Sequence, residues 1–408
     1  MYLRILHVLP ALDGGGVSQD TLALAEFLAN EPIKVFVAGA DGPLKNTTAW
    51  SNNLTFLPRN FRTKNPVRLF QNAFWLDQIC RKHHVDIVHV HSRAPAISCW
   101  MAFNVLQPIR RLLRRKNSLK TTWLSTFHAC YEHKNVFQRF YAGFMLWGAA
   151  TISISRFIHA HIQKTYPAQT EKKLTCIPRG RDPHYFSPDN VDKKAVQALK
   201  INIYNTKKPP PLIFLCPGRP TPLKGQLLLL DAFAQLSAAE TQKAYLVFLG
   251  LPAQHPYTKR VQNHARLMGL DKYVKVFEFT KDLRPFYAAA DVVVVPSLRP
   301  EGFGLVLAEA ALMEKPIITF NVGAAPELVI DQKTGWLLDS SPKNQPATNK
   351  TAANDLKNGL SDAIAFSNSQ RQSFGYHGRQ HVQKYYSQAS THKKTLQLYK
   401  RLALHLAE

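Results

Sequence analysis

Acidic residues are scarce in this 408-residue sequence: Asp and Glu number 27 against 52 Lys and Arg, which gives a net charge of +25. Such an excess of positive charge attracts an anionic partner, which can be nucleic acid, an anionic membrane surface or a phosphorylated substrate. A nucleic-acid-binding protein would carry a basic stripe with exposed aromatics or a known binding module, and neither is visible. We therefore expect no specific nucleic-acid partner.

Cysteines and long apolar runs are also few. The five cysteines lie far apart and form no Cys-x-x-Cys, which argues against a disulfide framework and a structural zinc site and suits a reducing cytosol. The longest apolar stretch, 141–154, is interrupted by Gly and Ser and is too short to span a bilayer. Arg4 and His7 interrupt the first apolar run, so it predicts a buried strand rather than a signal peptide.

What the chain does contain is an alternation of short apolar runs with segments of helical spacing, which predicts parallel sheets covered by helices. The length predicts two domains. A Lys- and Pro-rich segment at 207–211 predicts a linker, because a proline run cannot continue a helix or central strand. We therefore expect an α/β fold with an N-terminal domain over 1–190, a linker over 191–211, a C-terminal domain over 212–387 and a final helix over 388–408.

The chain is organised around the segment 299–309, which follows the β-branched run Val292–Val295. We expect a buried parallel strand and then a helix that ends near residue 314. Ligands of such sheets bind beyond the carboxyl ends of the strands, where Gly302 and Gly304 would let backbone amides approach a phosphate. Glu301 is expected in the loop and Glu309 about two turns into the helix, so that one carboxylate faces each end of an elongated ligand. The alternative is that both are ordinary helix charges.

Two further loops have the composition of anion sites. The glycines at 14–16 separate a predicted strand from a predicted helix, although they form neither a dinucleotide fingerprint nor a P-loop. After the strand expected at 212–216, Arg219 and Lys224 stand five residues apart, just before a helix that begins at Gln226. Two cations at a helix N-terminus predict a diphosphate clamp.

Histidines stand at or near the ends of two predicted strands. His128 follows the strand 121–127, at the edge where ligands bind, and a histidine there can donate to a phosphate or sugar oxygen near neutral pH. For His89 and His91, on or beside the preceding strand, we expect packing or supporting contacts.

A basic segment follows Pro108 and projects as a short amphipathic helix with a cationic face, typical of an element that lies on a membrane surface. The alternative is a solvated face on an ordinary helix. The basic residues of this patch are Arg110, Arg111, Arg114, Arg115 and Lys116.

Five segments together resemble, in order and spacing, the retaining GT-B glycosyltransferases of family 4, and more narrowly the bacterial lipopolysaccharide core and cell-envelope sugar transferases. The segments are 14–17, 126–128, 177–182, 218–225 and the Glu301/Glu309 pair. Two positions depart from the pattern: Arg179 stands where many members have Asn, and Leu305 where some relatives carry a cation.

The resemblance implies two facing Rossmann-like domains, the first binding the acceptor and the second a nucleotide-sugar donor of UDP or GDP type. It implies that Arg219 and Lys224 neutralise the donor diphosphate and that Glu309 binds the ribose. Glu301 would meet the sugar hydroxyls, and His128 the transferred sugar or its phosphate. The remaining residues expected to bind the donor are Gly15, Gly16, Gly218, Gly302, Phe303, Gly304 and Leu305.

The activity implied is transfer of a hexose-type sugar to an envelope glycolipid acceptor of the lipopolysaccharide-core kind, with retention of configuration. We expect a cytoplasmic protein, peripheral on the inner face of the membrane. No cofactor or metal is expected, which agrees with the absence of an Asp-x-Asp motif from the sequence. Two alternatives stay open: a nucleic-acid-binding protein and a GT-B nucleotide-sugar epimerase.

Overall fold

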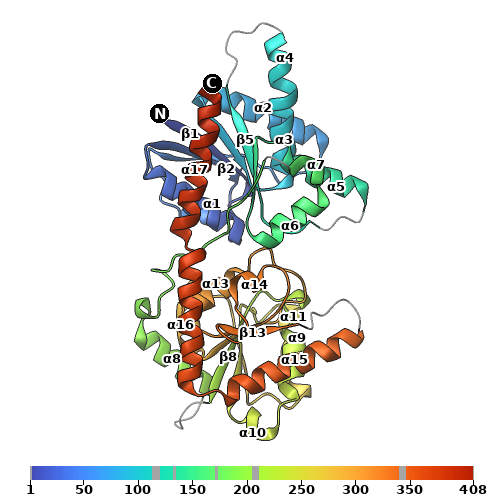
Figure 1. The fold of residues 1–408 in the computed structure, drawn as a ribbon, viewed down its shortest axis with the longest axis vertical. Helices are drawn as coiled ribbons and strands as arrows, with labels where there is room; N and C mark the ends of the chain where they lie inside the picture. Colours follow the sequence, from blue (N-terminus) through green and yellow to red (C-terminus); the bar gives the residue numbers. More distant parts are fainter. Residues whose placement is uncertain are drawn as a thin grey trace. The chain divides into compact units, whose positions relative to one another are not determined.

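The computed structural model describes residues 2–112, 120–131, 135–170, 173–204, 211–339 and 346–407. The chain divides into two compact units (Figure 1). Unit 1 comprises Met1–Pro178 and Ser390–Glu408, and unit 2 comprises Arg179–Ala389.

Unit 1 is built on a parallel sheet, whose described strands follow the order β3-β2-β1-β4-β5-β6-β7. Most of the central strands are buried on both faces, which explains their continuous apolar runs. The strands are β1 (Leu3–Ala11), β2 (Ile33–Ala40), β3 (Leu54–Pro58), β4 (Ile87–Val90), β5 (Thr122–Phe127), β6 (Ala150–Ser153) and β7 (Leu174–Cys176).

Helices cover both faces of this sheet (Figure 1). One face packs against α1 and the C-terminal helix α17, whose apolar residues share a core with those of β1 and β2. The helices are α1 (Gly16–Ala29), α2 (Pro66–His83), α3 (Arg93–Trp100), α4 (Gln107–Leu112), α5 (Val136–Gly143), α6 (Arg156–Thr165), α7 (Pro167–Thr170) and α17 (Gln388–Ala407), with 3-10 turns η1 (Pro43–Asn46) and η3 (Phe144–Leu146) and a π-helical turn η2 (Met101–Leu106).

The ends of α2 show how local sequence determines where a helix begins and ends. The side chain of Asn65 caps the first turn by accepting hydrogen bonds from the backbone N–H of Val67 at 2.9 Å and of Arg68 at 3.3 Å. Pro66 occupies the first helical position, where no N–H is needed. The helix ends at His83, and the next residue, His84, has a left-handed φ of 50°. The helix therefore begins beside the carboxyl edge of the sheet and returns the chain to the start of β4.

Unit 2 repeats the plan with a second parallel sheet, whose described strands follow the order β10-β9-β8-β11-β12-β13. The two parallel sheets with covering helices confirm the predicted fold class. The strands are β8 (Leu212–Pro217), β9 (Ala244–Leu249), β10 (Val274–Phe277), β11 (Val292–Val295), β12 (Ile317–Phe320) and β13 (Gly335–Leu338).

The helices of unit 2 share a core with its strands, centred on Phe214, Phe233, Phe248 and Trp336. They are α8 (Lys193–Tyr204), α9 (Gln226–Ala234), α10 (Ala238–Thr241), α11 (Pro256–Leu267), α12 (Arg284–Ala289), α13 (Leu305–Leu312), α14 (Ala325–Leu328), α15 (Pro346–Ala365) and α16 (Asn368–Tyr385), with 3-10 turns η4 (Pro188–Asn190) and η5 (Pro222–Lys224).

The segment 191–211, predicted as a linker, contains a helix. Most of it forms α8, whose last residues Ile203 and Tyr204 are buried in unit 2. The helix packs on α12 and β9, so tertiary burial stabilises a helix where the sequence predicted a linker. The two compact units meet in the chain at Pro178 and Arg179, before the predicted linker.

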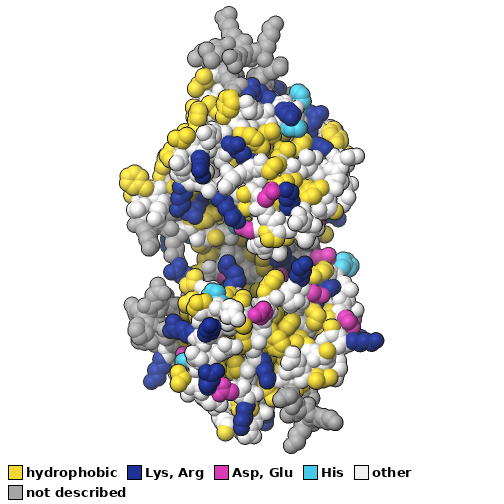
Figure 2. Space-filling model, turned by 180° about the vertical axis from the view of Figure 1, so that it is seen from behind, with side chains coloured by type: hydrophobic (Ala, Val, Ile, Leu, Met, Phe, Trp, Pro, Cys, Tyr) yellow, Lys and Arg dark blue, Asp and Glu magenta, His cyan; other side chains and the backbone are white. Residues whose placement is uncertain are grey.

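Lys and Arg side chains are spread over the visible face of each unit, with few Asp and Glu among them (Figure 2). This distribution agrees with the net charge of +25. No helix among the described residues is both long enough and apolar enough to cross a bilayer.

Candidate functional site

At the carboxyl edge of the unit 2 sheet, two loops bring a lysine and a glutamate together. Gly225 has a φ of 71°, and a Cβ there would lie 2.0 Å from the carbonyl oxygen of Pro296, so only glycine lets the loops pack this closely. Nζ of Lys224 lies 2.5 Å from Oε1 of Glu301. The hydroxyl of Ser297 donates to the same oxygen at 2.6 Å. The two charged side chains are 22% and 27% exposed, so a ligand can reach both.

A second cation lies in the same loop. Arg219 is exposed, and within the described chain its guanidinium has no hydrogen-bond or ion-pair partner. Its backbone carbonyl accepts a hydrogen bond from Nε2 of Gln226 at 3.0 Å, which fixes the loop against the start of α9. A Cβ at Gly218 would lie 3.4 Å from Cγ of Lys224, so the glycine leaves room beside that lysine. The loop therefore presents two cations.

The helix α13 begins shortly after Glu301, the partner of Lys224. Gly304 caps the helix with a φ of 90°, and a Cβ there would meet the side chain of Leu307 at 2.9 Å. Leu305 begins the helix, Phe303 is buried at 2% exposure, and Gly302 lies in the preceding loop. The amides of a first helical turn lack intrahelical acceptors, and this end of the helix favours negative charge. The arrangement suits an anionic group.

Glu309 lies about one turn into α13 rather than two, because the helix begins at Leu305. It is 6% exposed. Nε of Arg181 donates to Oε1 at 2.8 Å, and the hydroxyl of Tyr287 donates to Oε2 at 3.0 Å. Burial, and then the neighbouring Glu309 carboxylate, raise the pKa of Tyr287 well above its usual range, so the phenol stays a donor. Glu309 thus belongs to a buried network.

The backbone around Arg181 explains its position. A Cβ at Gly180 would lie 2.6 Å from the carbonyl carbon of Ser387, so the chain passes close to that residue. The backbone N–H of Arg181 donates to the carbonyl of Tyr386, and its carbonyl accepts from the N–H of Gln388. Arg181 is therefore held at both backbone groups, with its side chain directed to Glu309.

In unit 1 the glycine segment lies where the sequence predicted, between β1 and α1. Gly15 is the N-cap residue of α1 and Gly16 its first residue. Oδ1 of Asp13 accepts a hydrogen bond from the hydroxyl of Ser18 at 2.8 Å, and Oδ2 accepts one from Arg62 at 2.9 Å. The structure thus places Gly15 and Gly16 at the carboxyl edge of the unit 1 sheet, and their contact with a donor stays a prediction.

A chain of hydrogen-bonded histidines lies at the same edge of unit 1. Nδ1 of His7 is 3.1 Å from Nε2 of His91, and Nδ1 of His91 is 3.2 Å from Nε2 of His128. The side chains come from neighbouring places in the sheet, because β1 pairs with β4 and β4 with β5. Burial lowers the pKa of His7 to about 3, so this imidazole is neutral at physiological pH.

His89 lies beside this chain and has two neutral partners. Its Nδ1 is 2.5 Å from the hydroxyl of Tyr399, and its Nε2 is 2.6 Å from that of Thr126. His7, His89 and His91 form a group close enough to hold a metal, with candidate ligand atoms within 4.8 Å of one another. Both ring nitrogens of His89 already have hydrogen-bond partners, so the chemistry of the group is that of a hydrogen-bonded cluster. The supporting contacts predicted for His89 and His91 agree with this arrangement.

The predicted basic patch lies largely beyond the part of the chain that the structure describes. Arg110 and Arg111 belong to the backbone of α4, and their side chains lie outside the description. Arg114, Arg115 and Lys116 lie outside the described residues. Membrane binding through this patch stays a prediction.

Two protein-family models match the chain, one in each half. Residues 14–185 match the model described as Glycosyltransferase Family 4, and residues 200–381 match the one described as Glycosyl transferases group 1. The chain belongs to the glycosyltransferases. This agrees with the resemblance seen in the sequence, and the two matched segments end and begin close to the boundary between the compact units.

Several known proteins are similar to this glycosyltransferase. The lipopolysaccharide 1,2-N-acetylglucosaminetransferase of Salmonella typhimurium is 29% identical over 220 residues, which are 52% of this chain and 54% of that relative. The chain spans about half the length of the curated relatives that it matches. The crystal structure of a glycosyltransferase from Rickettsia africae covers 98% of both chains, with a TM-score of 0.82 and 27% identity. Anabaena HepE in complex with UDP-glucose shares the fold, with a TM-score of 0.77, 17% identity and coverage of 98% of this chain and 100% of that one.

The sequence prediction of the site missed two residues of this glycosyltransferase, Arg181 and Tyr287, which engage Glu309. Arg181 lies inside the motif 177–182, directly after a predicted strand. A charged residue at such a position indicates a candidate site residue, so the sequence did contain a signal for it. Tyr287 gave no such signal, because an apolar sequence surrounds it in α12.

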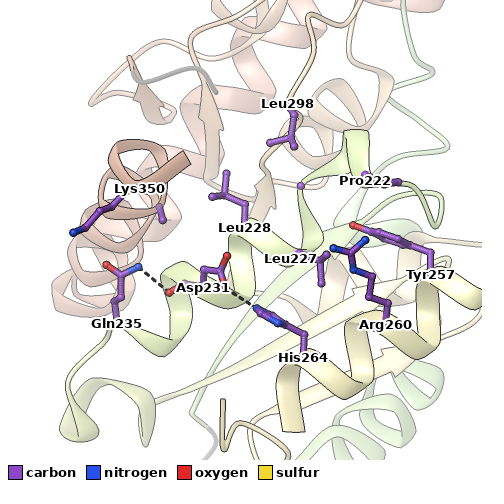
Figure 3. Close-up of a pocket in the computed structure, with 12 residues that line it drawn as sticks. Pro222, Leu227, Leu228, Asp231, Gln235, Tyr257, Arg260, His264, Leu298 and Lys350 are labelled. Atoms are coloured by element: carbon purple, nitrogen blue, oxygen red, sulfur yellow. Dashed lines mark hydrogen bonds and ion pairs between the residues drawn. The ribbon is translucent and has the colours of Figure 1, made fainter. Parts of the chain in front are cut away.

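A separate pocket of about 490 Å³ lies on unit 2 between α9, α11 and α15 (Figure 3). Tyr257, Arg260 and His264 project from α11 toward α9 (Figure 3). Nε2 of His264 is 2.5 Å from Oδ1 of Asp231. Burial raises the pKa of Tyr257 to about 12. Pro222, Gly225 and Leu298, from the two loops at the carboxyl edge of the sheet, form one side of this pocket, but the sequence-predicted site residues do not line it.

Proposed function

We propose that this glycosyltransferase moves a hexose-type sugar from a nucleotide-diphosphate sugar to an envelope glycolipid acceptor of the lipopolysaccharide-core kind. The observation that carries the proposal is the edge of unit 2, where Lys224 pairs with the carboxylate of Glu301, Arg219 lies in the same loop as Lys224, and α13 begins four residues after Glu301. Cations and a helix N-terminus suit a diphosphate, and a carboxylate suits sugar hydroxyls. The Salmonella relative, named for its action on lipopolysaccharide, supports the choice of acceptor.

For the donor, we propose a UDP- or GDP-sugar. Lys224 and Arg219 would neutralise the diphosphate, and the amides of Phe303, Gly304 and Leu305 would meet its oxygens. When Lys224 turns to the diphosphate, Glu301 is released to accept hydrogen bonds from the sugar. Glu309 would bind the ribose while Arg181 and Tyr287 keep its carboxylate oriented.

The chemistry requires stabilisation of a leaving nucleoside diphosphate and of a sugar with oxocarbenium character. Fixed cations and amides supply such stabilisation most effectively in a site from which water is excluded. We propose that Lys224, Arg219 and the start of α13 do this without a metal ion or cofactor. Retention of configuration and a contact of His128 with the transferred sugar are part of the proposal by resemblance to the family.

For the location, we propose a peripheral protein at the inner face of the cytoplasmic membrane. An apolar surface on α5 supports this in addition to the predicted basic patch. Val136, Phe137 and Phe140 are 80%, 84% and 61% exposed. Aromatic side chains beside basic residues are typical of segments that bind a membrane surface. Vesicles with anionic lipid should retain the wild-type protein, and Phe137→Ser with Phe140→Ser should weaken that retention.

The experiment that tests the function is sugar incorporation. Purified full-length protein is incubated with radiolabelled UDP- and GDP-sugars and a bacterial lipid fraction, with and without EDTA. We expect label in the lipid from one donor, undiminished by EDTA, and the anomeric configuration of the product decides retention. Conversion of the donor sugar without any acceptor would indicate an epimerase. Salt-sensitive DNA binding with no incorporation would contradict the proposal.

A further inference from the structure

A second pocket, of about 300 Å³, lies on unit 1 at the carboxyl edge of its sheet. It opens among the end of β1, the loop after β3 and the start of α3. Its charged lining residues are Arg62, Lys64 and Arg93, and no acidic residue belongs to the lining described. The predicted site residues do not line it either. Its charge therefore needs an explanation of its own.

Arg93 is held in a way that leaves its hydrogen-bond donors available. The guanidinium lies over the ring of Tyr131 at 4.4 Å and near that of Tyr141 at 5.6 Å. Such cation–π contacts use the flat faces of the guanidinium, whereas its N–H groups point outward in its plane. Within the described chain no carboxylate pairs with Arg93. A planar fork of donors held by aromatic rings suits two-point recognition of an oxyanion.

The charge balance of the pocket indicates the charge of its ligand. Arg62 is already paired with Asp13 at 2.9 Å, so those two charges cancel. Lys64 is exposed and, among the described residues, has no ion-pair partner. Lys64 and Arg93 therefore leave about two uncompensated positive charges, whereas a phosphate monoester carries about 1.5 to 2 negative charges at pH 7.

The start of α3 adds backbone donors on the same side. Ser92 is its N-cap residue, and the Ser92 side chain makes no capping hydrogen bond, while Ser92, Arg93 and Ala94 all line the pocket. The unsatisfied N–H groups of the first turn favour an anion, in agreement with the two cations.

We propose that this pocket binds a phosphate monoester carried by the acceptor of the glycosyl transfer. The role as acceptor site rests on the proposed function, whereas recognition of a sugar phosphate rests on Arg93, Lys64 and the pocket alone. The enzyme would thereby select phosphorylated acceptors over neutral ones through contacts in unit 1, whereas the cations proposed for the donor diphosphate, Arg219 and Lys224, belong to unit 2.

The test is titration of the full-length protein with glucose 6-phosphate by isothermal calorimetry, with glucose, glucuronate and inorganic phosphate as comparison ligands. We expect glucose 6-phosphate to bind and glucose not to bind. Each lost charge-assisted contact should weaken binding about tenfold, so Lys64→Gln loses about tenfold and Lys64→Gln with Arg93→Gln about a hundredfold. Lys64 is exposed, so its variant has no reason to misfold.

Two control variants test whether the loss of any positive charge, rather than of Lys64 or Arg93 in particular, weakens binding. Lys82→Gln removes an exposed charge from the other end of α2, and Lys243→Gln removes an exposed cation from unit 2, away from the proposed donor-binding residues. Both should bind glucose 6-phosphate as the wild type does. The inference is overturned if the Lys64 and Arg93 variants keep wild-type affinity, or if Lys82→Gln loses as much. Equal binding of glucuronate would overturn the preference for phosphate, and equal binding of inorganic phosphate would overturn the assignment to a sugar-borne group.

The failure of this inference can be told apart from failure of the proposed function. Donor binding is measured separately, by the shift in melting temperature that UDP- and GDP-sugars cause. If the pocket inference is right and the enzyme transfers sugar, phosphatase treatment of the lipid fraction lowers transfer by the wild type and has little effect on Lys64→Gln. If no nucleotide sugar binds but glucose 6-phosphate does, the proposed function fails and the pocket stands.

Discussion

The carboxyl edges of the two sheets differ in how they carry polar groups. In unit 2 the buried and half-buried groups form ion pairs, Arg181 with Glu309 and Lys224 with Glu301. In unit 1 they form a hydrogen-bonded cluster of histidines, in which burial lowers the pKa of His7 and of His89. The same strand-and-helix plan therefore supports two kinds of electrostatics.

The physical reason for the difference is the cost of burial. A charge buried alone is expensive, so it is either paired, as in unit 2, or removed by a shifted pKa, as in unit 1. In an ion pair the cation stays charged, so it can leave its carboxylate partner and pair with an incoming anionic ligand instead. Neutral imidazoles offer hydrogen bonds without net charge. The comparison thus predicts that an anionic ligand would disturb the ion pairs of unit 2, whereas a change of pH would disturb the histidines of unit 1.

The largest effect on stability is expected from breaking the buried ion pair of unit 2. Arg181→Met leaves the Glu309 carboxylate buried without its cation, which should cost about 3–5 kcal/mol of unfolding free energy. Amide hydrogen exchange of peptides from unit 2, followed at increasing urea concentrations, measures this loss of unfolding free energy. The control is Arg266→Met, whose pair with Asp271 is 3.8 Å long and exposed, and which should lose about 0–1 kcal/mol. Equal losses in both variants would contradict the role given to burial.

The largest effect on activity is expected at the half-buried pair of Lys224 and Glu301. Lys224→Ala or Glu301→Ala should fold normally and lower sugar transfer about 10²–10³-fold, because one charge contact to the reacting groups is lost. Turnover with the identified donor sugar measures this. Lys243→Ala removes an exposed cation at the opposite edge of the same sheet and should leave turnover unchanged. Wild-type turnover in Lys224→Ala or Glu301→Ala would remove that residue from the mechanism.

An intermediate effect is expected from pH on unit 1. The unfolded chain protonates His7 below about pH 6.5, whereas the folded protein keeps it neutral down to about pH 3. The unfolded state binds more protons in that window, so stability is full above about pH 6.5 and falls as the pH falls toward 3, by about 1.4 kcal/mol per pH unit. Urea unfolding between pH 7 and 4 measures this slope. His7→Gln should show a smaller slope, and an identical slope would show that His7 is not its source.

The smallest effect is expected from one hydrogen bond of the histidine cluster. Thr126→Val removes the 2.6 Å partner of His89 and should cost about 1 kcal/mol. Thr47→Val removes an exposed hydrogen bond to the carbonyl of Leu44, for which water substitutes, and should cost less. Equilibrium unfolding of both variants at pH 7 checks the order, and a reversed order would contradict the importance of the buried cluster.

Much of the fold could be predicted because its strands are short apolar runs. Val292–Val295 is buried throughout, as a continuous β-branched run predicts. The segment 340–358 is rich in Asn and Lys rather than in apolar residues, and α15 begins within it at Pro346. Ala352 and Leu356 of this helix are buried in the core of unit 2. Such segments depend on tertiary packing, which propensity does not contain.

The sequence predicted which types of residue belong to the candidate site, but it did not predict which of those residues contact one another. Lys224 and Glu301 were both expected at the donor, yet their contact depends on the close approach of loops at Gly225. Arg181 and Glu309 are separated by 128 positions in the sequence, and only the fold brings them together. The histidine cluster did have a signal, because each histidine lies in or directly after one of three neighbouring strands, but that signal requires the strand order.

The central claim is that the carboxyl edge of unit 2 binds a nucleotide-diphosphate sugar. The most direct measurement is the melting temperature of wild-type and Lys224→Ala protein with UDP, GDP and their common sugar conjugates, each with and without EDTA. A ligand at a hundred times its Kd stabilises the native state by about 2.7 kcal/mol. We predict that one nucleotide sugar raises the melting temperature of the wild type, that EDTA does not change this shift and that Lys224→Ala loses most of it. No shift with any nucleotide sugar, or the same shift in Lys224→Ala, would contradict the claim.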